Sequence, residues 1–171
     1  RFVLTHGAPI DDGPGLFGDA LPSIDPTSLA TDLENPVCRR IIAGSHADFL
    51  HIQRSEDEKT GKLRKEITVN EVRAVGSFLS MTPAEGGWRV VVIDSADEMN
   101  ANAANAVLKV LEEPPKRALL LLVSHNPGRL LPTIRSRCRR LVLKPLPERT
   151  IADLLAEYDP EILPQDATEL A

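Results

Sequence analysis

The chain has 171 residues, of which 42% are apolar, and its 20 Lys and Arg against 25 Asp and Glu give a net charge of −5. This length suits one α/β domain, or one domain with the start of another, and the apolar share excludes wholesale disorder. No stretch approaches the roughly 18 uninterrupted apolar residues of a membrane helix, and the mild acidity argues against a generic nucleic-acid coat protein.

The cysteines and the chain ends narrow the class of protein further. Cys38 and Cys138 lie far apart and form no C-x-x-C motif, which argues against a disulfide scaffold and excludes a thiolate zinc site. No signal peptide is visible, so a reducing cytoplasm is the expected compartment. The chain opens on Arg1 and runs out at 165–171 without a stop signal, so we expect an internal piece of a longer protein.

The first third of the chain predicts little regular structure. Residues 7–28 are rich in Gly, Pro, Asp and Ser and predict an exposed loop. Gly13-Pro-Gly15 is a turn rather than a phosphate loop, because no Gly-Lys-Ser/Thr follows it. The next expected elements are a short helix at 31–43 with Asn35-Pro36 near its start, a strand at 49–53, and a charged loop or hairpin tip at 55–66.

Strand and helix alternate from residue 69 onward, which predicts βαβ units and a parallel sheet. Apolar residues from 69 to 79 recur at helical spacing, with Asn70 as a candidate N-cap. The apolar run 88–93, which starts at Trp88, is typical of a parallel strand buried under helices. The remaining expected elements are a helix from Met99 to Leu111 that ends before Pro114-Pro115, a strand at 118–123, a short helix at 130–135, a third strand at 141–143 and a helix at 150–158.

Asp94 is the first candidate for chemistry, because it ends a buried strand and open α/β sheets bind ligands outside the carboxyl ends of their strands. An apolar strand followed by Asp has the form of a Walker B motif, whose carboxylate holds Mg²⁺ beside a nucleotide. The alternative is an Asp that caps the next helix. An active ATPase needs a second carboxylate beside this Asp, but Ser95 stands there, and a hydroxyl is no base at neutral pH. No G-x-x-x-x-G-K-[ST] motif occurs in the chain.

Residues 128–149 form a basic block, with seven basic residues against Glu148. Its net charge of +6 leaves −11 for the rest of the chain. The block could face DNA phosphates, an acidic partner or a nucleotide on a neighbouring subunit, and a solvated surface is the alternative. Arg137, between Ser136 and Cys138, is the leading candidate for a phosphate-directed finger, because a guanidinium stays charged and binds bidentately.

The other reactive residue types give weak signals. Cys138 is expected to be a small buried apolar residue rather than a nucleophile. Ser124 has no positioned His or Asp in the local sequence that would activate it. No metal site is expected, because metal-ligand spacing is missing from the histidines His6, His46, His51 and His125.

Three strings carry a resemblance to a known family. They are Asn105-Ala-Val-Leu-Lys-Val-Leu-Glu-Glu-Pro-Pro115, Leu121-Leu-Val-Ser-His-Asn-Pro127 and Leu131-Pro-Thr-Ile-Arg-Ser-Arg-Cys138. The Leu-Glu-Glu-Pro-Pro and Ser-Arg-Cys motifs at this spacing resemble the clamp-loader branch of the AAA+ proteins, over about residues 31–146. Within that branch, residues 39–48 and 67–73 are most similar to the delta-prime subunits of bacterial DNA polymerase III.

The resemblance implies a parallel-sheet, RecA-like AAA+ core, which is a partial P-loop NTPase fold, at 1–147. Residues 148–171 would begin a helical lid domain. Residues 29–66 would match a zinc module that has degenerated, because Cys38 alone remains of its four cysteines. Zinc is therefore not expected.

The resemblance also implies roles for individual residues. Asp94 would be a degenerate Walker B aspartate, Ser124 would lie in the sensor-1 region, and Arg137 would be an arginine finger that reaches the nucleotide site of an adjacent motor subunit. The motif residues are Glu112, Glu113, Pro114, Pro115, Ser136 and Cys138, and the candidates for contact with DNA or a partner are Arg129, Arg135, Arg139 and Arg140.

The implied function is DNA replication, as a stator subunit within a DNA-directed DNA polymerase (nucleotidyltransferase) holoenzyme. Such a subunit holds no cofactor firmly and does not hydrolyse ATP, but it completes an ATP site at the interface with a partner. The implied partners are the gamma/tau motor and delta subunits, the sliding clamp and primed DNA. The alternatives are an active gamma/tau-type ATPase and a DNA-binding AAA+ protein outside the loader that uses the basic block on phosphates.

Overall fold

The computed structural model divides the chain into two compact units, Arg1–Cys138 and Arg139–Ala171. It describes residues 1–7, 29–57, 59–85 and 87–158. The loop predicted at 7–28 lies outside the described residues except for Gly7. The assignment of 1–147 and 148–171 to two domains stays a prediction.

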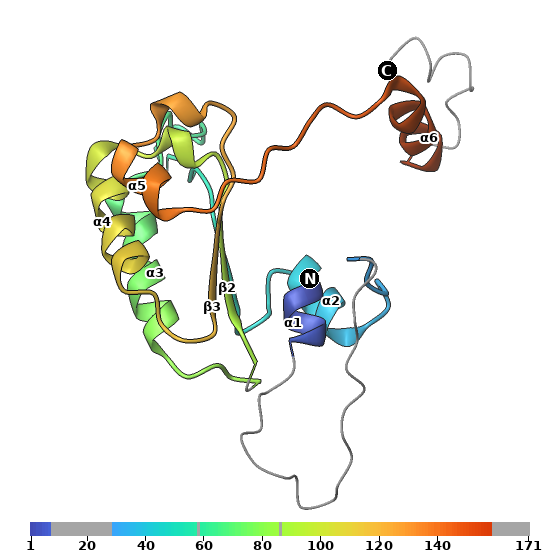
Figure 1. The fold of residues 1–171 in the computed structure, drawn as a ribbon, viewed down its shortest axis with the longest axis horizontal. Coiled ribbons are helices and arrows are strands. Elements are labelled where there is room, and N and C mark those ends of the chain that lie inside the picture. Colours follow the sequence, from blue (N-terminus) through green and yellow to red (C-terminus); the bar gives the residue numbers. More distant parts are fainter. Residues whose placement is uncertain (8–28, 58, 86, 159–171) are drawn as a thin grey trace, which may run out of the picture. The chain divides into compact units, whose positions relative to one another are not determined.

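A three-stranded parallel sheet organises the first unit (Figure 1). Its strands β1 (Phe49–Ile52), β2 (Arg89–Ile93) and β3 (Ala118–Leu122) lie in that spatial order, with Phe49 opposite Val90 and Arg89 opposite Ala118. The parallel α/β fold is therefore confirmed. Because the strands are parallel, their carboxyl ends meet at one edge of the sheet.

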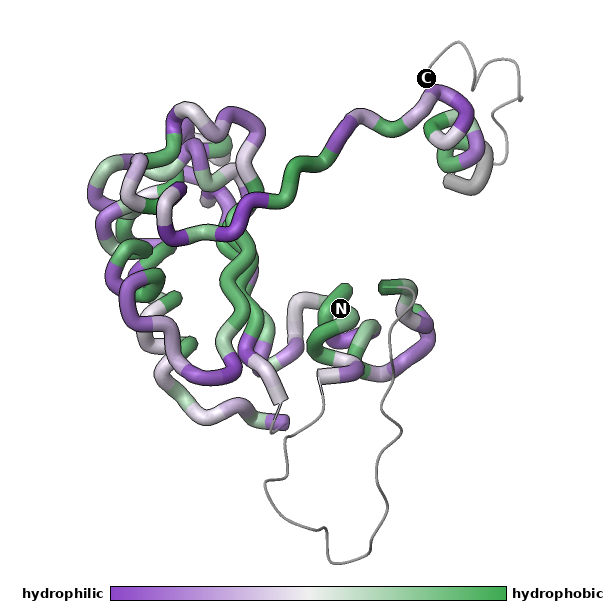
Figure 2. The backbone as a smooth tube through the Cα atoms, viewed as in Figure 1, coloured by the Kyte–Doolittle hydropathy of each residue, from purple (hydrophilic) through white to green (hydrophobic). Residues whose placement is uncertain are grey.

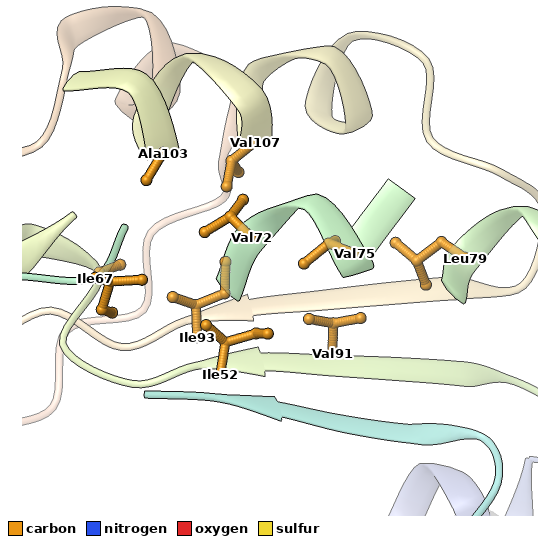
Figure 3. Packing of buried hydrophobic residues seen from close by; sticks show 10 residues of the cluster. Ile52, Ile67, Val72, Val75, Leu79, Val91, Ile93, Ala103 and Val107 are labelled. Atoms are coloured by element: carbon orange, nitrogen blue, oxygen red, sulfur yellow. The ribbon is translucent and has the colours of Figure 1, made fainter. Parts of the chain in front are cut away.

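Helices α3 (Val69–Ser80) and α4 (Ala101–Glu112) cover one face of the sheet (Figure 1). Alternate residues of the strands point to this face, so that Val91 and Ile93 of β2 pack against Val72 and Val75 of α3 (Figure 3). Burial of one such side chain contributes about 1.5–3 kcal/mol. Figure 2 shows the result as an apolar sheet beside helices that carry polar residues on their outer sides.

The helix starts follow from capping residues. Asn100 caps α4, because its side-chain oxygen accepts a hydrogen bond from the Ala103 N–H at 3.0 Å. The prediction of Asn70 as the cap of α3 is wrong, since Thr68 holds that position. Glu71, three residues further on, accepts a hydrogen bond from the Thr68 N–H at 2.8 Å, which completes a capping box that sets the start of the helix.

The remaining elements are short. They are α1 (Phe2–His6), α2 (Pro36–Ile42), the 3₁₀ turns η1 (Ala96–Glu98) and η2 (Pro127–Arg129), α5 (Pro132–Arg137) and α6 (Glu148–Tyr158). The hairpin tip predicted at 55–66 is confirmed by an antiparallel bridge between Glu56 and Leu63. Within the described part of the chain, no helix combines the length and apolar character that a membrane crossing requires.

The strand predicted at 141–143 is wrong. These residues form no strand, and Leu141 and Leu143 are 82% and 83% exposed. A strand needs a neighbour that pairs with its backbone N–H and C=O groups, and the described residues provide none for this segment. The apolar run alone was therefore not sufficient to make a strand.

A buried polar cluster lies at the amino edge of the sheet. Arg89, which is 5% exposed, donates hydrogen bonds to the carbonyl oxygens of Phe78 at 2.9 Å and Thr82 at 2.6 Å. Its guanidinium also lies 3.3 Å from Asp48, which is 1% exposed and accepts a hydrogen bond from the Ala84 N–H at 2.8 Å. A buried charge is stable only when it is paired, and here Arg89 and Asp48 pair with each other and with the loop after α3. The contacts therefore fix this loop to the starts of β1 and β2.

Candidate functional site

The candidate site lies at the carboxyl edge of the sheet, where the loops after β2 and β3 are joined by backbone hydrogen bonds. The Val123 N–H donates to Ile93 O at 3.0 Å, and the Ala96 N–H donates to Val123 O at 2.7 Å. The Arg54 Nε atom, after β1, forms an ion pair with Glu98 Oε2 at 2.8 Å. All three loops are thereby held in fixed relation to one another.

Asp94 directly follows β2. Its N–H donates to Ile52 O at 2.8 Å, so the backbone still continues the parallel ladder. Its half-buried carboxylate makes no hydrogen bond or ion pair with another described residue, and it is therefore available to an external ligand. A Walker B aspartate requires such a carboxylate. The assignment of this role to Asp94 stays a prediction.

Ser95 turns the chain from β2 into η1. It adopts a left-handed backbone conformation with φ 55° and ψ 51°, which costs a non-glycine residue roughly 1–2 kcal/mol. Such conformations concentrate at functional sites, where surrounding contacts hold them in place. Here the holding contacts are the backbone bonds of the two neighbouring residues, Asp94 and Ala96.

Asp97, which no sequence motif singled out, organises the loop after β3. Its carboxylate is 8% exposed and accepts hydrogen bonds from the backbone N–H groups of His125 at 3.0 Å and Asn126 at 3.2 Å. Burial opposes ionisation, but the nearby Ser124 hydroxyl and these backbone donors outweigh it, and the pKa of Asp97 lies below its usual 3.8. The Asp-Ser-Ala-Asp string after a buried strand was the available signal.

Ser124, the predicted sensor-1 residue, lies in the loop just after β3, near Asp97. Its Oγ atom is buried and has no hydrogen-bond partner of good geometry among the described residues, although it lies near enough to Asp97 to lower the pKa of that carboxyl. Asp94 and Ser124 thus lie in the loops that follow the adjacent strands β2 and β3.

Arg137, the predicted arginine finger, is the last residue of α5. Its Nη2 atom donates to Glu112 Oε1 at 3.0 Å, and its Nη1 atom donates to Thr133 O at 3.1 Å. The Arg137 side chain is 37% exposed and that of Glu112 is 51% exposed. These two contacts use two of the five guanidinium N–H groups, so three donors stay free of described partners.

The Arg137–Glu112 pair joins the two motifs that carried the resemblance. Glu112 is the last residue of α4 and belongs to Leu-Glu-Glu-Pro-Pro, whereas Arg137 belongs to Ser-Arg-Cys. Glu113 is the C-cap of α4, and Pro114 and Pro115 begin the loop that follows the helix. The two motifs thus form one structural unit at the ends of two helices.

The other Ser-Arg-Cys residues have local roles. The Ser136 hydroxyl donates to Thr133 O at 3.1 Å, inside α5. Cys138 is partly buried, and this burial raises the pKa of its thiol. Less thiolate is present at neutral pH when the pKa rises, which disfavours Cys138 as a nucleophile.

The basic block is divided between the two units. Arg129 and Arg135 lie in the first unit, are exposed and make no ion pair with a described residue. Arg129 also lines a hollow of about 190 Å³ between η1, the start of α4 and the start of α5. Arg139 and Arg140 belong to the second unit, so the structure does not place them against Arg137.

Metal-ligating side chains do not gather in the described ranges. There, no three His, Cys, Asp or Glu side chains come together in a way that could hold a metal ion. His46 is 5% exposed, and its Nδ1 accepts a hydrogen bond from the Asp48 N–H at 3.1 Å, which is a structural contact.

The fold is a parallel sheet with helices on one face, and polar side chains follow two adjacent strands. A structural comparison agrees with this fold class. The fold is similar to the crystal structure of a DNA polymerase III gamma subunit-related protein from Thermotoga maritima, with a TM-score of 0.52 and 30% identity over 72% of this chain and 43% of that chain.

Residues 19–147 match the profile of the family described as DNA polymerase III, delta subunit, and the chain belongs to this family. It is 46% identical over 105 residues to the DNA polymerase III subunit delta' of Pseudomonas aeruginosa, which is 61% of this chain and 30% of that protein. It is 38% identical over 122 residues to the delta' subunit of Bacillus subtilis, 71% of this chain and 35% of that protein. The resemblance to delta-prime subunits is confirmed, and the chain spans about a third of the length of these relatives.

Gamma/tau subunits are more distant relatives. The chain is 34% identical over 88 residues to the DNA polymerase III subunit gamma/tau of Mycobacterium tuberculosis, which is 52% of this chain and 15% of that protein. A delta'-type subunit and a gamma/tau-type subunit are therefore the two functions to be distinguished.

Proposed function

We propose that this chain is the core of a delta'-type stator subunit in a DNA polymerase III clamp loader. In this role the protein supplies Arg137 in trans to an ATP site on a neighbouring gamma/tau-type subunit. The observation that carries the proposal is the state of the Arg137 guanidinium, which is anchored at two points and keeps three N–H donors free at the surface.

The geometry of Arg137 suits the charge that develops in phosphoryl transfer. Negative charge on the equatorial oxygens of the γ-phosphate is stabilised by donors that are already in place. A guanidinium fixed by Glu112 and Thr133 can donate its free N–H groups without first giving up its anchors. Arginine fingers in GTPases contribute roughly 10³–10⁵ in rate.

The residues after β2 support a subunit that does not hydrolyse ATP itself. Asp94 has a free carboxylate, but Ser95 beside it offers no base to orient an attacking water. ATP therefore belongs at the interface with the partner rather than to this chain as a firmly held cofactor. The gamma/tau and delta subunits, the sliding clamp and primed DNA complete the proposed assembly, in which ATP binding favours the ring conformation that opens the clamp.

The test is Arg137→Ala in the full-length protein, assembled with the motor and delta subunits, clamp and primed DNA. We expect ATP turnover to fall at the completed site by about 10³-fold, while size-exclusion chromatography shows an intact complex. Arg73→Ala is the matched control, because Arg73 is an exposed arginine on α3 without an ion pair to a described residue. Unchanged turnover in an intact complex would overturn the arginine-finger role.

The likeness to gamma/tau subunits favours a motor ATPase as the second candidate function. The two functions differ in what the full-length protein does alone. A stator shows no ATP hydrolysis above background in the absence of partners, whereas a motor subunit binds and hydrolyses ATP. Hydrolysis by the purified full-length protein would therefore replace the stator proposal with the motor.

A further inference from the structure

We infer that Glu112 is a positioning residue for Arg137, and that it raises ATP turnover by holding the guanidinium in the orientation that the neighbouring site requires. This inference rests on the proposed function, because it assigns the residue that orients the finger. Glu112 itself contacts neither ATP nor the reacting atoms in this proposal.

The anchoring geometry carries the inference. Thr133 O is one turn back in the same helix, so its contact with Nη1 fixes the guanidinium only relative to α5. Glu112 Oε1 comes from α4, 25 residues earlier, and its contact with Nη2 fixes the guanidinium relative to the core that α4 packs on. Two contacts on different Nη atoms define the plane of the fork, which one contact cannot do.

The Arg137–Glu112 ion pair contributes little to the stability of the fold. Both side chains are more than one-third exposed, and ion pairs between exposed groups contribute little to folding because water and salt screen them. The Arg137–Glu112 contact is also the only ion pair that joins α4 and α5 in the described part of the chain. Its removal is therefore expected to change the orientation of Arg137 and to leave the fold intact.

Glu112 could instead hold Arg137 away from the nucleotide and have to release it. The number of unpaired guanidinium donors argues against a requirement for release. Three guanidinium N–H groups have no described partner, so a phosphate can bind Arg137 while the Glu112 contact persists. Positioning and release predict opposite signs, because loss of Glu112 lowers turnover in the first case and raises it in the second.

The chain offers a matched control in the adjacent residue. Glu113 is exposed, carries the same charge and lies at the same helix end, but it makes no side-chain hydrogen bond or ion pair with a described residue. Glu113→Ala therefore repeats the loss of charge without the loss of the anchor. Glu112→Gln keeps a carbonyl oxygen that can accept the same hydrogen bond from Arg137.

The experiment measures ATP turnover of the full complex with Glu112→Ala, Glu112→Gln, Glu113→Ala, Arg137→Ala and the double variant of Glu112 and Arg137. We expect Glu112→Ala to lower kcat on the order of 10-fold with little change in KM, since misplacement of a reacting group acts on kcat. Glu112→Gln should recover part of this loss, and Glu113→Ala should match wild type. In the Arg137→Ala background, Glu112→Ala should have no further effect.

The outcomes separate the two proposals. If Arg137→Ala leaves turnover unchanged, the proposed function fails, and the positioning role fails with it. If Arg137→Ala abolishes turnover but Glu112→Ala behaves like Glu113→Ala, the function stands and the positioning role is overturned. Higher turnover in Glu112→Ala would also overturn it. Thermal unfolding of each variant identifies any loss of fold. If Glu112→Ala does not fold, the kcat of Glu112→Gln decides between the outcomes: a reduced kcat supports the positioning role, and a kcat equal to that of wild type or higher overturns it.

Discussion

At the scale of single residues, Asp97 explains how the loop after β3 keeps its shape. Two consecutive backbone N–H groups, of His125 and Asn126, point at one buried carboxylate. A buried polar group without a partner costs about 1–3 kcal/mol, and more when it is charged, so the two donors satisfy the Asp97 carboxylate while the carboxylate fixes the loop. Because Ser124 lies in the same loop, Asp97 also sets the position of the predicted sensor-1 residue.

We predict that Asp97→Asn destabilises the full-length protein by about 2 kcal/mol. The Asn amide offers one acceptor atom in place of two, and its NH₂ group then faces a backbone donor. The wild-type advantage should be complete above the usual pKa of 3.8 and be lost as the pH falls through the lowered pKa of Asp97. Urea unfolding at pH 7 and pH 3 measures both effects, with Glu113→Gln as the exposed control. Equal stability of the two variants at pH 7 would contradict this role.

At the scale of elements, local patterns predicted most of the fold. The apolar run of β2 and the helical spacing of α4 predicted both elements to within two residues, because β2 is buried on both faces and α4 is buried on one. The start of α3 was predicted wrongly because Asn70 and Thr68 are both good caps, and Glu71 decides between them only through its side-chain contacts. The strand at 141–143 failed because pairing depends on a neighbour that no local pattern specifies.

The candidate site was predictable to the same extent. The motifs indicated Asp94, Ser124 and Arg137, because each lies at the end of a strand or helix that the pattern defines. The partners of these residues were not predictable. Glu112 meets Arg137 across 25 residues, and Asp97 meets His125 across 28, so only the packing of α4, α5 and the strands brings them together.

Glu71 gives a prediction for α3 and the charged hairpin together. The Ser55 hydroxyl donates to Glu71 Oε1 at 2.5 Å, and the Thr68 N–H donates to Oε2. Burial opposes ionisation, but these hydrogen bonds outweigh it and lower the pKa of Glu71 from 4.5 to about 2. We predict that Glu71→Ala lowers the free energy of unfolding by about 1 kcal/mol at pH 7, through loss of the cap.

Glu71→Gln separates the cap from the charge. Glutamine also completes a capping box, so this variant should keep most of the helix stability at pH 7. The depressed pKa stabilises the wild type fully above pH 4.5, and this contribution is lost as the pH falls toward 2. The difference between wild type and Glu71→Gln in chemical unfolding should therefore shrink over that range. A difference that is constant with pH would show that the charge of Glu71 does not stabilise α3.

At the scale of the whole molecule, the two edges of the sheet differ in the polar groups that they carry. The amino edge is closed by the buried Asp48–Arg89 pair, whose partners are all internal. The carboxyl edge carries the half-buried Asp94 carboxylate, which makes no hydrogen bond or ion pair with a described residue. The amino edge therefore serves the fold alone, whereas the carboxyl edge also offers the Asp94 carboxylate to a ligand or partner.

The charge of the basic block gives the last prediction. Arg129 and Arg135 are exposed and lack ion-pair partners among the described residues, so their charges are available to an external anion on a chain of net charge −5. If they contact DNA phosphates in the assembled loader, the affinity for primed DNA falls with salt, and each contact adds about 0.9 to the slope of log K against log salt. The double variant Arg129→Ala/Arg135→Ala should then reduce the salt slope of DNA binding by the complex by about 1–2, whereas Arg73→Ala should leave that slope unchanged.

The full-length protein alone should bind DNA weakly, since two contacts supply little affinity. A slope identical to wild type would assign these arginines to a protein partner instead, and strong salt-dependent binding by the protein alone would favour a DNA-binding AAA+ protein outside the loader.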